Sequence, residues 1–207
     1  MSLTDVRLEG RVSVVAQRKR EMRGLCLERR NKRSIKERSR LDKAIVSRMT
    51  GLASFIYAKA VLLYMPTGAE IDVRPLIQAS LEAGKLTALP RCGEDRSMTF
   101  HIIESPEQLS PGAFGIYEPE SELPAYDPDD AAKDLALCVI PAIAWDRRGF
   151  RLGFGGGYYD RFLPGFAGAK AGLAYEEDIF ESLPRGRYDI RSDFIVTEKG
   201  VRTFSYG

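Results

Sequence analysis

Hydrophobic residues are arranged differently in the first quarter of the chain and in the remainder. Residues 14–54 are predicted to form two helices, and the sequence SIKE at residues 34–37 fits a capping box that begins the second. Hydrophobic residues at helical spacing give this second helix one face that we expect to be buried, formed by Ile35, Leu41, Ile45 and Met49.

After residue 54, short and continuous hydrophobic runs predict strands that are buried on both faces of a sheet. These runs occupy residues 60–66, 86–90, 98–103, 135–143, 169–175 and 194–198. Helices are predicted at residues 72–84, where Gly84 ends the helix, and at residues 158–163. The alternation predicts an α/β fold: a single-domain layered sheet, largely parallel, flanked by helices, with an N-terminal helical pair.

The domain organisation follows from the lack of any repeat or low-complexity segment. We expect an N-terminal extension at residues 1–17 and a single domain over residues 18–207. Residues 105–130 are rich in proline and turn residues, which predicts a long functional or covering loop and not a domain linker. With 207 residues, 44% of them hydrophobic, the chain is long enough to bury a substantial core.

The hydrophobic runs and the cysteines lead us to expect a cytoplasmic protein. The longest hydrophobic run, residues 135–145, is too short to cross a bilayer and contains a proline, and the first ten residues lack a signal-peptide core. The three cysteines, Cys26, Cys92 and Cys138, form no CxxC motif. We therefore expect buried thiols in a reducing compartment, without disulfides or a zinc site.

Charge is distributed unevenly along the chain. Residues 1–50 contain 15 basic and 6 acidic residues, a net charge of +9, so the remainder carries −7 of the overall +2. A basic N-terminal part suggests a polyanionic ligand. Lys19 and Arg23 stand four residues apart on one predicted helix face, where a triphosphate would relieve their mutual repulsion. A solvated basic helix explains the same spacing.

The most distinctive motif is GFGGGYYDRF, residues 153–162, which follows a predicted strand by a few residues. Ligands bind at the carboxyl ends of strands in such sheets. Glycine amides and the start of the following helix can bind an anion, with Arg151 and Arg161 beside them. The motif matches neither GxxxxGK[ST] nor GxGxxG, and a flexible hinge explains the glycines alone about equally well.

Several acidic residues and the single histidine have two interpretations each. Asp160 and Asp193 could bind Mg²⁺, or Asp160 could complement the helix dipole and Asp193 could belong to a turn. Glu70 could point into a pocket or simply precede a helix. His101 has no partner for a catalytic triad, so a surface or structural role is expected.

Several motifs together resemble the 5-formyltetrahydrofolate cyclo-ligase family. They are KREMR, YMPTGAEIDVRPLI, LPR with the later MTF, GAFGIYEPE, RRGFRLGFGGGYYDRFL and TEKGV, which stand in the family's order between residues 19 and 201. The resemblance implies a cytoplasmic enzyme that uses ATP and Mg²⁺ to convert 5-formyltetrahydrofolate to 5,10-methenyltetrahydrofolate, ADP and phosphate. It implies small-molecule substrates, with no nucleic acid, membrane or obligate protein partner.

The family's functional residues can be carried over position by position. ATP contacts would fall on Lys19, Arg20, Glu21, Met22, Arg23, Arg151, Leu152, Gly153, Phe154, Gly155, Gly156, Gly157, Tyr158 and Tyr159. Folate contacts would fall on Met65, Glu70, Phe154, Gly155, Gly156, Gly157 and Tyr158. Metal ligands would be Asp160 and Asp193, and catalytic roles would fall on Tyr158 and Arg151.

The sequence departs from the family pattern at two positions. Gly156 stands where some members have lysine, so Lys19, Arg23 and Arg151 would have to neutralise the phosphates. Tyr188 stands where members often have histidine.

Two other functions fit parts of the pattern. A sugar-phosphate isomerase could use a similar sheet and glycine-rich loop, but would need no ATP. An RNA-binding module could use the basic residues 1–50, although aromatic residues for base stacking are not interleaved there.

Overall fold

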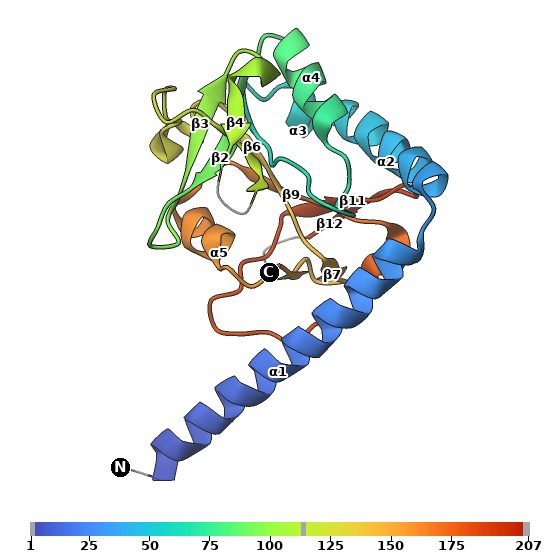
Figure 1. Ribbon diagram of the computed structural model, residues 1–207, viewed down its shortest axis with the longest axis vertical. Helices are drawn as coiled ribbons and strands as arrows, with labels where there is room; N and C mark the ends of the chain where they lie inside the picture. Colours follow the sequence, from blue (N-terminus) through green and yellow to red (C-terminus); the bar gives the residue numbers. More distant parts are fainter. Residues whose placement is uncertain (1–2, 113–114, 205–207) are drawn as a thin grey trace.

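A seven-stranded sheet forms the centre of the protein (Figure 1). The structure is a computed structural model. It describes the backbone of residues 3–112 and 115–204 and the side chains of residues 14–112 and 115–204. The strand order is β12-β11-β9-β6-β1-β2-β3. From β11 to β2 all neighbours are parallel, whereas β12 and β3 pair antiparallel at the edges, which confirms the predicted layered, largely parallel sheet. The bounds are β1 Ala60–Leu62, β2 Leu86–Cys92, β3 Met98–Ile103, β6 Leu137–Ile140, β9 Ala169–Leu173, β11 Phe194–Val196 and β12 Val201–Thr203.

Helices cover both faces of this sheet. Alternate residues of β1 belong to different cores: Val61 lies in the core shared with α2 (Ile35–Thr50) and α4 (Arg74–Glu82). Leu62 lies in the opposite core, next to α5 (Tyr158–Phe162). Every central strand is therefore enclosed, which explains its continuous hydrophobic sequence. Among the described residues, the other short helices include α3 Ala53–Ile56 and the 3-10 helices Pro106–Gln108, Pro128–Asp130, Leu163–Gly165 and Glu176–Asp178.

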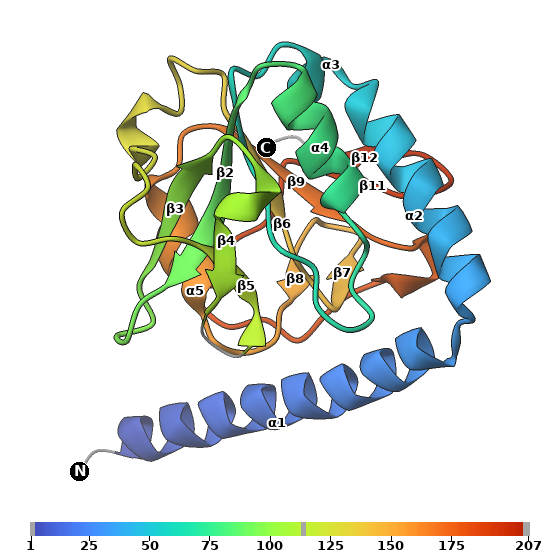
Figure 2. The same cartoon turned by 45° about the horizontal axis from the view of Figure 1, so that its top comes forward.

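The long helix α1 (Leu3–Lys32) runs along the outside of the body and passes below β5, β7 and β8 in the view of Figure 2. Its C-terminal end is fixed by Arg29 and Arg30, and by Arg33 just after the helix, whose guanidinium groups surround Asp178. The predicted N-terminal helical pair is confirmed, although α1 begins well before Val14. Helix α1 continues unbroken past residue 17. The division of the chain into an extension, residues 1–17, and a domain, residues 18–207, stays a prediction.

Helix α2 begins as predicted, since the Ser34 hydroxyl accepts a hydrogen bond from the backbone N–H of Glu37 at 3.2 Å. Leu41, Ile45 and Met49 are buried as expected. The prediction was wrong for Ile35, which is 79% exposed. It is the first residue of α2, ahead of the turns that carry the buried residues.

Residues 105–130 contain more regular structure than the predicted covering loop. They include a hairpin of β4 (Leu109–Pro111) and β5 (Tyr117–Pro119), which packs beside β2 and β3. His101 has a structural role, because the ring is 8% exposed and its Nδ1 lies 2.8 Å from the carbonyl oxygen of Leu123.

A second small sheet, ordered β10-β7-β8, leads directly into the glycine motif, which begins after β8. Its strands are β7 Ala144–Asp146, β8 Arg151–Leu152 and β10 Ile179–Phe180. Trp145 is fully buried and donates a hydrogen bond from its indole N–H to the Leu173 carbonyl at 3.0 Å, which joins this sheet to β9. Among the described helices, none combines the length and hydropathy needed to span a bilayer.

Candidate active site

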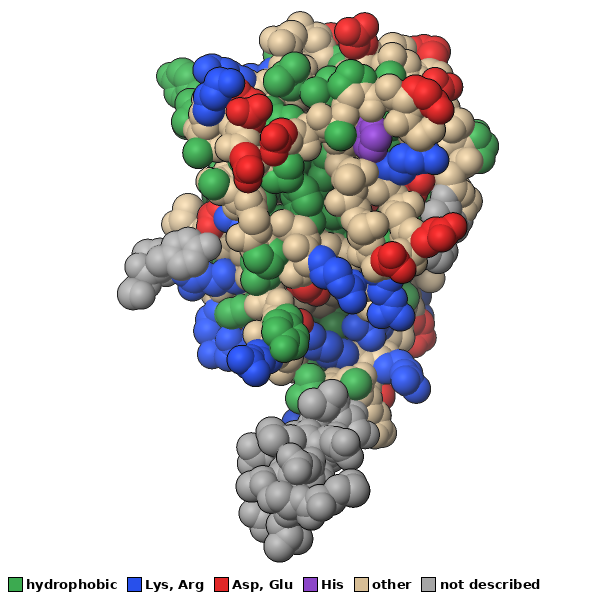
Figure 3. All heavy atoms as spheres, turned by 90° about the vertical axis from the view of Figure 1, so that its left-hand side faces the viewer, with side chains coloured by type: hydrophobic (Ala, Val, Ile, Leu, Met, Phe, Trp, Pro, Cys, Tyr) green, Lys and Arg blue, Asp and Glu red, His purple; other side chains and the backbone are tan. Residues whose placement is uncertain are grey.

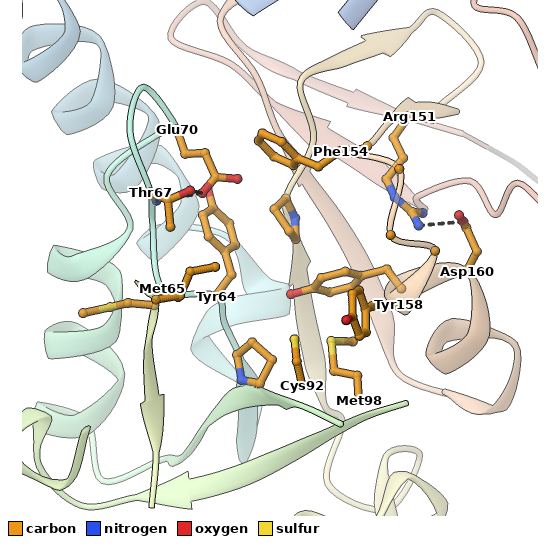
Figure 4. Close-up of a pocket in the computed structure, with 18 of the residues that line it drawn as sticks. Tyr64, Met65, Thr67, Glu70, Cys92, Met98, Arg151, Phe154, Tyr158 and Asp160 are labelled. Carbon is orange, nitrogen blue, oxygen red and sulfur yellow. Dashed lines mark hydrogen bonds and ion pairs between the residues drawn. The ribbon is translucent and has the colours of Figure 1, made fainter. Parts of the chain in front are cut away.

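A cavity of about 550 Å³ lies where the parallel strands end (Figure 4). Residues that follow β1 form one wall, among them Met65 and Glu70, and residues 151–160 form another. Figure 4 shows Cys92 and Met98 on a third side, on the hairpin of β2 and β3. Its size and mixed lining are typical of small-molecule sites.

The glycine segment is shaped by its contact with α1. Gly155 and Gly157 have φ angles of 105° and 75°, in the region that favours glycine. Arg23 donates from Nε to the carbonyl oxygen of Gly153 at 2.8 Å, and a Cβ on Gly155 would lie 3.4 Å from the Arg23 guanidinium carbon. The segment therefore lies close against α1. Helix α5 has only five residues, so its dipole contributes less than the sequence suggested.

Three cations line the same end of the cavity. Lys19 pairs with Asp189 at 2.5 Å, and Arg151 pairs with Asp160 at 2.6 Å. Arg23 completes the group beside Gly153. On the face shown in Figure 3, basic side chains gather in the lower half, where α1 leaves the body. The spacing of Lys19 and Arg23 thus places both on the cavity side of α1.

Glu70 points toward the cavity from the wall opposite Arg151 (Figure 4). Its Oε2 accepts hydrogen bonds from the backbone N–H and the hydroxyl of Thr67, at 2.8 and 3.0 Å. Burial raises the pKa of the Glu70 carboxyl, and these hydrogen bonds oppose the shift. The carboxyl is held in place and can accept a ligand N–H.

Two tyrosines follow the glycines. Tyr158 projects across the middle of the cavity (Figure 4). The hydroxyl of Tyr159 is buried and has no hydrogen-bond partner among the described residues. Because burial raises the pKa of Tyr159 well above its usual value, this hydroxyl keeps its proton and can donate to a ligand.

Some predicted site residues lie outside the cavity. Arg20 and Glu21 are exposed on α1, and Met22 packs against the core around Cys26. Asp193 precedes β11 and accepts a hydrogen bond from the backbone N–H of Lys170 at 2.7 Å. The structure therefore does not bring Asp193 to Asp160. The other predicted contacts do line the cavity: Lys19, Arg23, Met65, Glu70, Arg151, Leu152, Gly153, Phe154, Gly155, Gly156, Gly157, Tyr158, Tyr159 and Asp160.

The cavity also contains residues that sequence reasoning did not assign to it. They are Tyr64, Thr67, Pro90, Cys92, Met98, Ile116, Tyr117, Glu118, Pro141 and Asp189. They come from several separate elements, within β2, β3 and β5 and after β1 and β6, so only the fold brings them together. A signal existed for Glu118, because it lies within the motif GAFGIYEPE.

The chain is similar in sequence to enzymes of one family. The model of the 5-formyltetrahydrofolate cyclo-ligase family matches residues 15–198. A Caenorhabditis elegans protein named probable 5-formyltetrahydrofolate cyclo-ligase is 28% identical over 199 residues, covering 90% of this chain and 96% of that protein. The Escherichia coli K12 5-formyltetrahydrofolate cyclo-ligase is 28% identical over 188 residues, covering 84% and 97% respectively.

Solved structures agree with these sequence matches. The NMR structure of Aquifex aeolicus 5,10-methenyltetrahydrofolate synthetase has a TM-score of 0.80 and 40% sequence identity, covering 91% of this chain and 94% of that one. A Mycoplasma pneumoniae 5,10-methenyltetrahydrofolate synthetase, 23% identical with a TM-score of 0.69, shares the fold. These matches favour an enzyme over the RNA-binding alternative and bear out the resemblance seen in the motifs. The chain belongs to the 5-formyltetrahydrofolate cyclo-ligase family of enzymes.

Proposed function

We propose that this protein converts 5-formyltetrahydrofolate to 5,10-methenyltetrahydrofolate and uses Mg²⁺ and ATP, with release of ADP and phosphate. The observation that carries the proposal is the position of the glycine segment. Residues 153–157 line a single cavity together with the cations Lys19, Arg23 and Arg151 and with the Glu70 wall. One cavity thus has a cationic end for phosphates and a less polar end for a folate ring.

The chemistry requires activation of a formamide, which is a poor electrophile. The formyl oxygen attacks the γ-phosphorus of ATP, and the bond from phosphorus to ADP breaks. The second folate nitrogen then attacks the formyl carbon and loses its proton, and the phosphate leaves with the former formyl oxygen. The product contains the methenyl bridge. This sequence needs positioning and charge neutralisation and no covalent protein nucleophile.

Each group in the cavity has a role in this scheme. Arg151, Lys19 and Arg23 would neutralise the phosphates together with the glycine amides. Glu70 would orient the pterin or the formamide, and Tyr158 would lie beside the reacting carbon. Enclosure by the segment around Tyr117 would protect the phosphorylated intermediate from water.

The donor set fits a magnesium ion held largely by phosphate. No group of three or more His, Cys, Asp or Glu side chains suited to a metal occurs among the described residues. Mg²⁺ needs only one or two carboxylates in addition to phosphate oxygens and water. Asp160 lines the cavity and is the residue we assign to the metal. The ion would neutralise charge on the transferred phosphoryl group.

Turnover is the direct test. Purified protein mixed with 5-formyltetrahydrofolate and Mg-ATP should form the methenyl chromophore, followed by its absorbance. Omission of ATP should abolish the signal, since the phosphoryl donor is lost. Folded protein that gives no signal with both substrates present would refute the proposal. Conversion of a sugar phosphate without ATP would support the isomerase alternative.

Removal of the metal should stop the reaction and leave the fold intact. Excess EDTA is expected to lower the rate at least about 100-fold, because the phosphates lose a neutralising charge. Addition of Mg²⁺ beyond the EDTA should restore the rate. The circular dichroism spectrum should not change, since the ion would bind through Asp160 and nucleotide. Full activity in EDTA would exclude a metal requirement.

The proposed function also implies a cellular location and a set of partners. We infer a cytoplasmic enzyme whose partners are the reduced folate and ATP, and which needs no nucleic acid, membrane or obligate protein partner.

A further inference from the structure

We propose that Glu118 is a further substrate-binding residue, which accepts hydrogen bonds from the N–H groups on the pterin edge of the folate. This inference rests on the proposed function, because it assigns part of the same substrate to the same cavity. Glu118 lies on β5, in the hairpin beside β2 and β3, and lines the cavity.

Glu118 is a buried acid without a positive partner. The residue is 3% exposed, and no ion pair within 4.0 Å involves it in the part of the chain that the structure describes. Its Oε1 accepts a long hydrogen bond, 3.4 Å, from the backbone N–H of Cys92, and the Cys92 thiol, a weak donor, also hydrogen-bonds to the carboxyl group. A buried carboxylate with so weak a set of donors is costly to keep. Donors from a ligand would offset that cost.

The carboxyl group is also held in one place. Its Oε2 lies under Gly112, where an added Cβ would be only 2.5 Å away. Burial is the main cause that raises the pKa of the neighbouring Cys92 thiol to about 11, and the charge of Glu118 and the hydrogen bond to its carboxyl group add to the shift. Cys92 is therefore a neutral thiol at physiological pH and does not compete with the carboxylate for ligand donors.

The position separates Glu118 from the phosphate end. Cys92, its hydrogen-bond partner, lies with Met98 on the β2–β3 side of the cavity, while Arg151 and Asp160 occupy a different side (Figure 4). An acid among hydrophobic side chains would repel phosphate. It suits a flat, neutral ring that presents adjacent N–H donors, and the 2-amino group and N3–H of a pterin provide such a pair. A carboxylate accepts two parallel N–H donors in the same way from arginine.

The surroundings of Glu70 and Glu118 suggest a different part of the substrate for each of them. Glu70 faces the cavity from the β1 wall and is already bonded through Oε2 to Thr67. Glu118 on β5 would hold the pterin edge. Glu70 would remain available for the formamide side of the substrate.

The test compares Glu118→Gln with Glu120→Gln, which changes an exposed glutamate just beyond β5. Glutamine keeps the shape but replaces one acceptor with a donor. Calorimetric titration with 5-formyltetrahydrofolate should show about 10- to 100-fold weaker binding to Glu118→Gln and no change for Glu120→Gln. ADP affinity should stay within about twofold for both variants. Equal folate affinity in the two variants would overturn the inference.

A ligand lacking the 2-amino group identifies the contact. The 2-desamino analogue of 5-formyltetrahydrofolate should bind wild-type protein about 10-fold more weakly, and Glu118→Gln should lose little further affinity for it. If loss of the 2-amino group weakened binding equally in wild-type protein and in Glu118→Gln, the assignment of Glu118 to the pterin edge would be contradicted. Gly112→Ala, which displaces the carboxyl without removing it, should weaken folate binding to an intermediate degree; unchanged binding there would also count against the inference. Wild-type protein that fails to bind or convert 5-formyltetrahydrofolate would refute the proposed function itself.

Discussion

Replacement of Arg151 with alanine should lower kcat/KM for Mg-ATP by about 100- to 1000-fold. Arg151 is only 8% exposed, and its guanidinium group donates to Asp160 at 2.6 Å and to the carbonyl of Ile190 at 3.2 Å. Its loss removes a positive charge from the end of the cavity where we propose that the phosphates bind, and it leaves Asp160 without its ion-pair partner, so the negative charge there rises. Steady-state kinetics with each substrate varied in turn will measure the effect.

Arg147→Ala is the matched control, because Arg147 is an exposed arginine close in sequence that pairs with Glu181. Its kinetics should match wild type. Arg151→Lys should recover only part of the activity, since lysine restores charge but not the two-pronged geometry of the guanidinium group. Circular dichroism establishes that the Arg151 variants are folded. Wild-type kinetics in folded Arg151→Ala would remove Arg151 from the site.

Asp178→Asn should destabilise the protein by about 3–5 kcal/mol. Asp178 is fully buried and lies 3.2 Å from Arg30 and 2.5 Å from Arg29, with Arg33 at 3.4 Å. Neutralisation of the acid leaves buried guanidinium charge uncompensated, although Arg33 also pairs with Glu177 and Arg30 with the carbonyl of Ala142. Urea denaturation followed by circular dichroism will give the change in the free energy of unfolding.

Asp129→Asn serves as the control for that measurement, since Asp129 is exposed in a 3-10 helix. Its free energy of unfolding should stay within about 0.5 kcal/mol of wild type. If Asp178→Asn changed stability no more than this control, the buried arginine cluster would not hold α1 to the body.

The parts of the fold that the sequence predicted are those with strong local signals. The N-cap at Ser34 and the hydrophobic spacing of Leu41, Ile45 and Met49 define α2 without tertiary information. Strands β4 and β5 were not predicted because each has three residues, among them prolines, and gains its structure by pairing. Short strands of this kind carry too few residues for an alternating pattern to emerge.

The site was predictable where the motifs are contiguous and less so elsewhere. Residues 151–160 lie together in the chain and in space, so the glycine motif located one whole wall. For acidic residues at separate positions, the sequence did not predict which ones line the cavity. Asp189 pairs with Lys19 at the cavity, whereas Asp193, four residues later, accepts a hydrogen bond from the backbone of β9. Their neighbours come from distant elements, which the sequence alone does not bring together.

The attachment of α1 links two measurements that are usually made separately. The helix carries Lys19 and Arg23 into the cavity, and the arginine cluster around Asp178 holds it against the body. In the proposed function the nucleotide contacts Lys19 and therefore binds molecules in which α1 is docked, so its apparent dissociation constant is the intrinsic one divided by the docked fraction. Saturating nucleotide must therefore slow the exchange of α1 amide hydrogens with deuterated solvent, and Asp178→Asn must speed that exchange and weaken nucleotide binding together.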